Sequence, residues 1–247
     1  MNMNMPVSNA PAPSSSGPKS FFQVWMDALT KPSEATYAEI ASSPNAKAMT
    51  AYLWVFVGFL VQFFLSALVR GATLGRYNSI LQQYGLGNGG GFGGRGLVGT
   101  LVGAVCGGPI LAVIATLFFA IGTALILWVS RMFGGHGTND QMASVFAAFQ
   151  APLSVIFGVL SLFAAIPLVG LCFTVIEWLL LVYGIVLAII AVKGVGPVSW
   201  GGAVGSVLIP LAAVLLLCCC IVGGISLAAG AGLKGLLQQL QQGGTGY

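Results

Sequence analysis

Few residues of this 247-residue chain could do chemistry, because only 6% of them are charged. The acid that stands inside a long apolar run is Glu177. A carboxylate within a membrane costs several kcal/mol unless it is paired, hydrated or protonated, so it is a functional candidate. Trp178 and the turn at 167–170 place it about 10 Å from one interface. We expect an interfacial or structural role for Glu177, with a proton or ion relay as the alternative.

A second group of reactive residues lies in one polar loop, which contains Arg131, Asp140 and the single histidine, His136. One His and one carboxylate do not make a zinc site, which needs three or four ligands. No second acid or nucleophile lies close enough in sequence to complete a catalytic set. We therefore expect no metal, cofactor or catalytic residue here, but a turn in which Thr138 or Asn139 caps the next helix.

The composition indicates a membrane protein. Hydrophobic residues make up 57% of the chain and charged residues only 6%. In a soluble protein about a quarter of the residues are charged. The nine Lys and Arg residues are scattered and form no basic patch, so nucleic acid is not an expected partner. The glycine-rich NGGGFGGRG has neither the Lys and Ser/Thr of a P-loop nor a preceding strand, which excludes a phosphate loop. The partner that remains is the lipid bilayer.

The elements that must position these residues are apolar runs of about 20 residues, the length that a bilayer core of about 30 Å requires. Two of them form Leu153–Val192, which we expect to be a transmembrane hairpin. The other expected spans are Ala48–Val69, Ile110–Ser130 and Ala203–Ala228. We predict an all-α, polytopic transmembrane helical bundle with five spans.

The segments between the spans contain many helix breakers. We expect Gly71–Gly96 to be a loop without regular structure. Gly107 to Pro109 should end a separate segment, Leu97–Cys106, whose insertion into the membrane the sequence leaves open. A short helix, Gln141–Gln150, should precede the hairpin, which the chain enters at Pro152.

The N-terminal part divides into a disordered tail, 1–18, and an amphipathic segment, 19–46. Phe21, Phe22, Trp25 and Leu29 recur at helical spacing and are candidate interfacial anchors. Pro32 should end this helix, and Ser33 should cap a second one. We expect the segment to pack on its own membrane domain, 47–230, or to lie at the interface, with a docking site for a soluble partner as the alternative. A short amphipathic helix and flexible tail, 231–247, should close the chain.

One candidate packing ridge lies before Pro109. Gly99, Gly103 and Gly107 recur every fourth residue, a pattern that lets helix backbones approach closely in lipid. We expect the ridge to serve contacts within the chain, with a homodimer interface as the alternative.

The order of these parts resembles the Yip1 family over about residues 20 to 225. The resemblance rests on a W..aL.kP...y..I pattern, a paired-glycine loop followed by a helix and an Ala-Pro, and a closing Lys-Gly-Val. The residues that carry it are Trp25, Leu29, Lys31, Pro32, Tyr37, Ile40, Gly134, Gly135, Gln141, Ala151 and Pro152. It implies an N-terminal tail followed by five spans.

The DLYGP motif and later Gly-Tyr pair of eukaryotic members have no counterpart here, so association with GTPases is not supported by the sequence. The chain looks more like the prokaryotic branch, which implies a prokaryotic cell membrane, and basic residues divide five against four for a cytoplasmic N-terminus. The sequence favours a non-enzymatic multipass scaffold that organises the membrane or binds a membrane-protein partner or a second copy. A small transporter or channel using Glu177 is the alternative.

Overall fold

The computed structural model describes residues 20–83, 97–163, 166 and 169–220. The described residues form helices and no strands, and five of the helices are long and apolar enough to cross a membrane. The labelled helices are α1 (Phe21–Thr30), α2 (Glu34–Ser42), α3 (Ala48–Gln83), α4 (Leu97–Met132), α5 (Asn139–Phe163) and α6 (Val169–Val195), and they are followed by the helix Trp200–Cys220. The predicted all-α, five-span bundle is confirmed.

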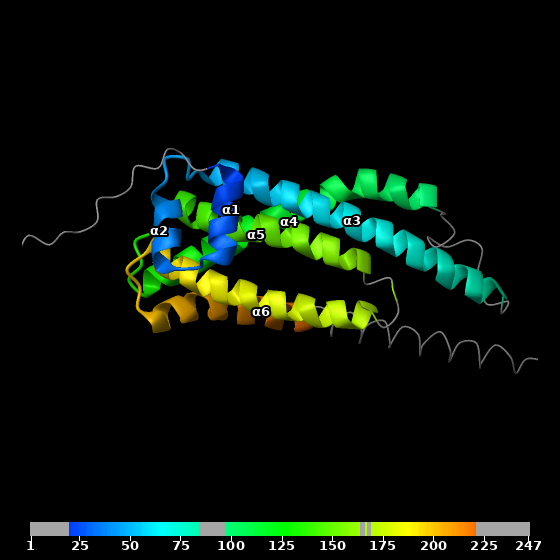
Figure 1. Cartoon of the computed structure of the whole chain (residues 1–247). Coiled ribbons are helices and arrows are strands. Elements are labelled where there is room, and N and C mark those ends of the chain that lie inside the picture. Colours follow the sequence, from blue (N-terminus) through cyan, green and yellow to red (C-terminus); the bar gives the residue numbers. More distant parts are fainter. Residues whose placement is uncertain (1–19, 84–96, 164–165, 167–168, 221–247) are drawn as a thin grey trace, which may run out of the picture.

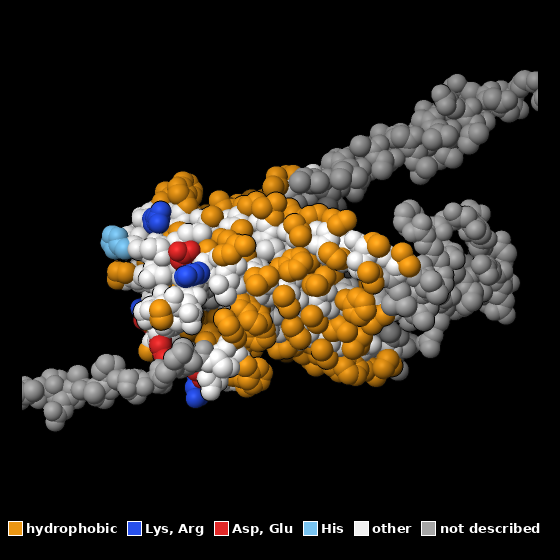
Figure 2. All heavy atoms as spheres, turned by 90° about the horizontal axis from the view of Figure 1, so that it is seen from above, with side chains coloured by type: hydrophobic (Ala, Val, Ile, Leu, Met, Phe, Trp, Pro, Cys, Tyr) orange, Lys and Arg blue, Asp and Glu red, His pale blue; other side chains and the backbone are white. Residues whose placement is uncertain are grey.

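The long helices lie alongside one another, and α1 and α2 lie across one end of the bundle (Figure 1). We call this end, made by α1, α2 and residues 43–47, 131–140 and 193–200, the polar end. Figure 2 shows charged side chains gathered at one end of the visible face and hydrophobic side chains over the rest. The charged residues of the polar end are Asp27, Lys31, Glu34, Glu39, Lys47, Arg131, Asp140 and Lys193. Among the side chains that the structure describes, only one charged group, that of Glu177, lies outside it.

Helices α3 and α5 approach each other closely because glycine stands at their crossing. A Cβ atom on Gly58 would lie 2.9 Å from the carbonyl oxygen of Ala151, and one on Gly158 would lie 2.9 Å from the Cα of Gln62. A buried cluster that includes Val55 and Ala147 fills the space between them nearer the polar end. Small residues thus bring two spans together where lipid supplies no hydrophobic drive for helix association.

The predicted boundaries of α3 and α4 were wrong. Helix α3 continues to Gln83, so the segment expected to be a loop from Gly71 is helical over its first part. Helix α4 is continuous from Leu97 through Pro109, so the expected separate segment is part of this helix, and the candidate span Val102–Met132 begins within it. Glycine costs a helix about 1 kcal/mol relative to alanine, and a membrane helix tolerates proline where its neighbours satisfy the freed carbonyl.

Helix α5 corrects a further boundary, since it runs from Asn139 through Pro152 to Phe163 without a break. The expected short helix and the third span are therefore one element. Buried neighbours on both sides of Pro152, including Ala151 and Leu153, hold it in the bundle core, which outweighs the lost hydrogen bond.

The first span of the expected hairpin ends at Phe163, and the second begins at Val169. Gly170 therefore belongs to α6 and not to the turn. The helix Trp200–Cys220 passes through Pro210 and covers most of the expected fifth span. The expected disordered tail 1–18 and the expected C-terminal helix 231–247 lie outside the described residues.

Candidate functional site

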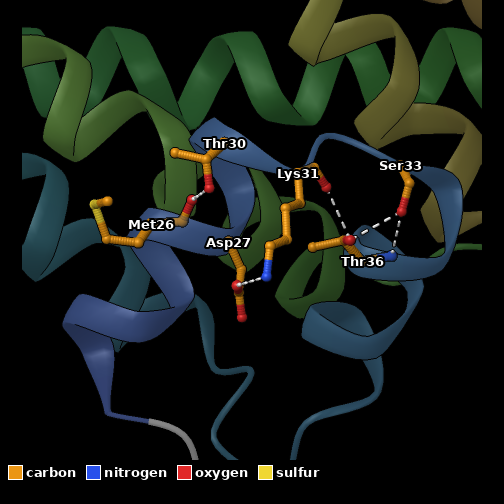
Figure 3. Close-up of polar contacts among 6 residues, drawn as sticks. All are labelled: Met26, Asp27, Thr30, Lys31, Ser33 and Thr36. Carbon is orange, nitrogen blue, oxygen red and sulfur yellow. Dashed lines mark hydrogen bonds and ion pairs between the residues drawn. The ribbon is translucent and has the colours of Figure 1, made fainter.

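Helices α1 and α2, with the turn between them, form a compact unit that we call the cap. Figure 3 shows the polar contacts of this turn. The Ser33 hydroxyl accepts a hydrogen bond from the Thr36 amide at 3.1 Å, which confirms the predicted N-cap. The Thr36 hydroxyl in turn donates to the Lys31 carbonyl at 2.9 Å. These bonds fix how α2 leaves α1, because they satisfy backbone groups that a helix end leaves unpaired.

The last carbonyls of α1 explain why two tyrosines contact the cap. In a continuing helix the Ala28 carbonyl would accept from residue 32, but Pro32 has no N–H. The Tyr37 hydroxyl donates to that carbonyl instead, at 3.0 Å. The Tyr183 hydroxyl of α6 donates to the next carbonyl, that of Leu29. Side chains of α2 and α6 therefore complete the hydrogen bonding of α1, and the second of them joins the cap to a membrane span.

Tyr37 is fully buried and packs edge-on against Phe149 of α5, with ring centroids 6.3 Å apart. Burial raises the pKa of the Tyr37 hydroxyl well above its ordinary value, and the nearby Tyr183 raises it further. Both effects disfavour a phenolate at this position. The group therefore serves as a neutral hydrogen-bond donor to the α1 carbonyl.

A second joint between cap and bundle lies at the end of α6. The Lys193 Nζ donates to the Glu34 Oε2 at 3.0 Å and also lies 4.9 Å from the centre of the Trp200 ring. Beside it, a Cβ on Gly194 would lie 2.7 Å from the Cβ of Tyr37. The absent side chain of this glycine is what allows α2 to rest on α6.

The expected interfacial anchors divide into two groups. Phe21 and Trp25 pack on Trp54 of α3, with ring centroids 4.6 and 5.1 Å apart, and Leu29 packs on the buried core. Phe22 projects outward with 67% of its surface exposed. Three of the four anchors thus contact the protein's own bundle, while their contact with lipid stays a prediction.

A groove of about 640 Å³ lies between the cap and the bundle. Its aromatic wall consists of Phe21, Trp25 and Trp54, and Ser144 and the alanines of α5 contribute further lining. Its remaining lining residues are Val24, Asp27, Thr36, Glu39, Ile40, Ser42, Ser43, Pro44, Asn45, Ala46, Thr50 and Ala51. The volume is in the range of small-molecule sites, about 300–1,000 Å³.

The polar residues of the loop between α4 and α5 hydrogen-bond to backbone groups at helix ends and within the loop. Asp140 accepts a hydrogen bond from the Ala48 amide at 3.0 Å, which caps α3 from the start of α5. The Thr138 hydroxyl accepts from the Gln141 amide at 3.3 Å, and the Gln141 side chain accepts from the Thr138 amide, so the predicted cap of this helix is a reciprocal pair. Arg131 donates to the Gly137 carbonyl at 3.2 Å.

His136 of the same loop is exposed. Within the described ranges no three His, Cys, Asp or Glu side chains come together as a metal site would require. The geometry of this loop is that of a structural connection between α4 and α5.

Glu177 lies in the third turn of α6 and is half-buried. Its sequence neighbours Ile176 and Trp178 are exposed, as the lipid-facing residues of a span are. No hydrogen bond or ion pair joins Glu177 to another residue in the part of the chain that the structure describes. The structure does not bring Arg131, His136 or Asp140 to it, because they belong to the polar end and α6 begins at the opposite end (Figure 1).

The glycine ridge of α4 faces open space where it is described. A Cβ atom on Gly103 or Gly107 would meet nothing within 4 Å, and the surroundings of Gly99 lie outside the described side chains. No described helix therefore approaches α4 closely at Gly103 or Gly107. The use of the ridge stays a prediction.

Sequence reasoning missed the residues that join the cap to the bundle and the spans to each other. Tyr183 lies in an apolar run and gives no signal by itself, but Pro32 signals that the Ala28 carbonyl needs another donor. Gly58 and Gly158 stand singly and lack the fourth-residue glycine repeat of α4. A single glycine within a long apolar run is the sequence feature that could have indicated Gly58 and Gly158 as contact points between spans.

Comparison with curated proteins and with solved structures gives no significant match. A family model described as Yip1 domain matches residues 26–221, from within α1 to just past the last described helix. The match includes the cap joints and all five candidate spans. The chain is therefore a multipass membrane protein that belongs to the Yip1 family, whose members are generally non-enzymatic.

Proposed function

We propose that this protein is a membrane scaffold that presents its cap at one membrane surface to a membrane-protein partner or to a second copy of itself. The observation that carries the proposal is the docked cap. It is joined to α6 by the Tyr183 hydroxyl and by the Lys193–Glu34 ion pair, and to α3 by the aromatic contacts of Trp54. A surface held in this way keeps one shape, which a partner can recognise without paying to order it.

The interior of the bundle supports a scaffold better than the alternative, a transporter or channel. The buried polar side chains of the described residues are Thr123, Ser130, Ser154 and Ser206. Each hydroxyl donates to a carbonyl three or four residues earlier in its own helix. A pathway for ions needs polar groups that face one another across the bundle, and in this part of the chain Glu177 has no such counterpart.

The proposal places the polar end and the N-terminus in the cytoplasm of a prokaryotic cell. The weak excess of basic residues on that side supports this orientation. GTPase binding is not part of the proposal.

Photo-crosslinking in cells tests the scaffold. A photoreactive amino acid at Phe22, which is 67% exposed on the cap, should give a discrete adduct with a membrane protein or with a second copy. The same amino acid at Leu117, which is 60% exposed on the lipid-facing side of α4, is the control and should give lipid adducts. Equal and diffuse labelling from both positions would contradict a scaffold that works through the cap.

A further inference from the structure

We propose that the groove between the cap and the bundle holds a glycerol diester lipid of the membrane, with one acyl chain between its walls and an ester carbonyl at the hydroxyls of Thr50 and Ser144. This inference goes beyond the scaffold function and does not depend on it. The depth of the groove, its continuity with a lipid-facing surface and these two hydroxyls support it. The charges of Asp27 and Glu39, which also line the groove but interact with other groups of the protein, have no part in it.

The groove reaches below the charged ends of the membrane spans. Its α1 wall contacts Trp54, which lies about 9 Å along the helix axis from the start of α3 at Ala48. The same helix α1 accepts the hydrogen bond of Tyr183, which lies about 15 Å along α6 from Lys193. Lys193 belongs to the polar end, whose charged groups need water or lipid headgroups. The groove therefore extends to the level at which acyl chains begin.

The groove adjoins a surface of α3 that faces lipid. Thr50 and Trp54 line the groove, and the next face of the same helix carries Met49, Leu53 and Val57. These three residues recur every fourth position and are 81%, 59% and 39% exposed. They belong to a candidate membrane span, and acyl chains cover the apolar side chains that a span exposes. A lipid on this surface can therefore enter the groove without crossing water.

Two hydroxyls of the lining can bind the ester of such a lipid. Thr50 and Ser144 are half-buried, and neither hydroxyl has a hydrogen-bond partner in the part of the chain that the structure describes. The half-buried Thr116 of α4, by contrast, donates to the Ala112 carbonyl at 2.7 Å. A hydroxyl in apolar surroundings costs free energy when it has no partner. Ester carbonyls accept hydrogen bonds and lie between the headgroup and the chains of a lipid, so they supply the missing acceptors.

The order of polar and apolar groups along the groove matches their order along a lipid. Trp54 lies one turn deeper than Thr50 on α3, and Ala147 and Ala148 lie one turn deeper than Ser144 on α5. A chain that begins at an ester beside the hydroxyls therefore passes between the aromatic wall and the alanines. Lipid tails outside the protein are equally apolar, so the preference for the groove comes from packing against the rings and from the hydrogen bonds of the ester.

A pair of phosphatidylcholines tests the ester directly. The two lipids have the same short chains and the same headgroup, but one has ester linkages and the other has ether linkages. Native mass spectrometry counts the lipid bound to the purified full-length protein. We expect the diester to bind about tenfold more tightly, because an ether lacks the carbonyl that accepts from Thr50 and Ser144. Equal binding of the two lipids, or tighter binding of the diether, would overturn the proposal.

Two variants separate the hydroxyls from the space that they line. Thr50→Val combined with Ser144→Ala removes both hydroxyls and nearly keeps the shape, so the affinity for the diester should fall about tenfold and that for the diether should stay unchanged. Ser144→Leu fills the groove and should lower the affinity for both lipids about tenfold. The matched control is Thr116→Val, which lies outside the groove and should change either affinity less than about twofold.

Parent-like binding of the diester to the double variant would overturn the role of the hydroxyls. Parent-like binding of both lipids to Ser144→Leu would overturn the site.

A photoreactive amino acid at Val24, which lines the groove on α1, identifies the occupant in native membranes. An adduct with the mass of a diacyl lipid that is lost when Ser144→Leu is added supports the proposal. A lipid adduct that persists in Ser144→Leu would come from the surrounding bilayer and would overturn it. An adduct with residues 1–19 of this chain or with another protein would show that a polypeptide fills the groove, which would also overturn it.

Discussion

The two ends of the bundle are held together by different kinds of contact. At the polar end, side chains reach specific backbone groups far away in sequence, as Tyr183 does at Leu29 and Asp140 does at Ala48. Farther along the spans, the described contacts between helices are mainly apolar, and one hydrogen bond, from Ser66 to the Ser161 hydroxyl at 3.3 Å, crosses between α3 and α5. The difference indicates that the contacts of the polar end fix how the helices are placed relative to one another, whereas the apolar contacts contribute stability without that specificity.

Opening the joint between α2 and α6 should have the largest effect. In Gly194→Leu the new side chain has no room, because its Cβ would lie 2.7 Å from the Cβ of Tyr37 and 2.9 Å from the Glu34 carbonyl oxygen. Overpacking of this kind costs about 1–3 kcal/mol or more, and we expect the cap to detach. Cleavage of the cap by proteinase K should become at least about tenfold faster, in line with that free energy.

Gly107→Leu is the matched control, because a Cβ there meets nothing within 4 Å. Cleavage of the cap by proteinase K should stay at the parent rate in this variant. Equal protection of the cap in both variants would show that the cap does not depend on close contact with α6.

Removing the Tyr37 hydroxyl, which donates to the Ala28 carbonyl in place of the N–H that Pro32 lacks, should have an intermediate effect. Tyr37→Phe keeps the ring and leaves the Ala28 carbonyl buried without its partner, which costs about 1–3 kcal/mol. Hydrogen exchange of the α1 amides should accelerate accordingly. Tyr52→Phe, which loses a long 3.3 Å bond with Asn139 in an exposed position, is the control and should leave α1 unchanged. Slow exchange in Tyr37→Phe would mean that the hydroxyl is dispensable.

A smaller effect should follow from alkaline pH. The pKa of Tyr37 is raised in the folded protein, so the folded state holds its proton where the unfolded state loses it. The resulting stability is fully present below about pH 10, the ordinary tyrosine pKa, and falls as the pH rises from there toward the folded value. The cap should therefore become sensitive to proteinase K, which cleaves after uncharged residues, above about pH 10, and Tyr37→Phe should lose this dependence. A parent protein whose cap is equally protected at pH 9 and about pH 11 would contradict the assignment.

The fold could be predicted in outline because span length and hydrophobicity are local properties. The five spans follow from apolar runs long enough for a bilayer, and Ser33 and Thr138 follow from the chemistry of helix caps. The wrong boundaries share one cause. Pro109, Pro152 and Gly71 predict breaks from local propensity, whereas α4, α5 and α3 continue through them.

The candidate site could be predicted only in part. The spacing of Trp25 and Leu29 indicated an amphipathic helix, but their contacts with α3 and the buried core depend on how the chain folds back. The role of Asp140 also depends on tertiary structure, because its partner, the Ala48 amide, is 92 residues away. The close approaches that the structure describes occur at single glycines such as Gly58, which no small-residue repeat marks, and the use of Gly103 stays a prediction.

Glu177 is the described charged residue that lies outside the polar end, so it best distinguishes a scaffold from a transporter or channel. The scaffold account predicts no gradient-driven flux of protons or other ions through the reconstituted parent protein above that of empty vesicles. It also predicts that Glu177→Gln changes the stability in detergent by at most about 1–2 kcal/mol, because the half-buried carboxylate has no partner among the described residues. A flux in the parent protein that Glu177→Gln abolishes while the fold survives would contradict the account and assign the protein to transport.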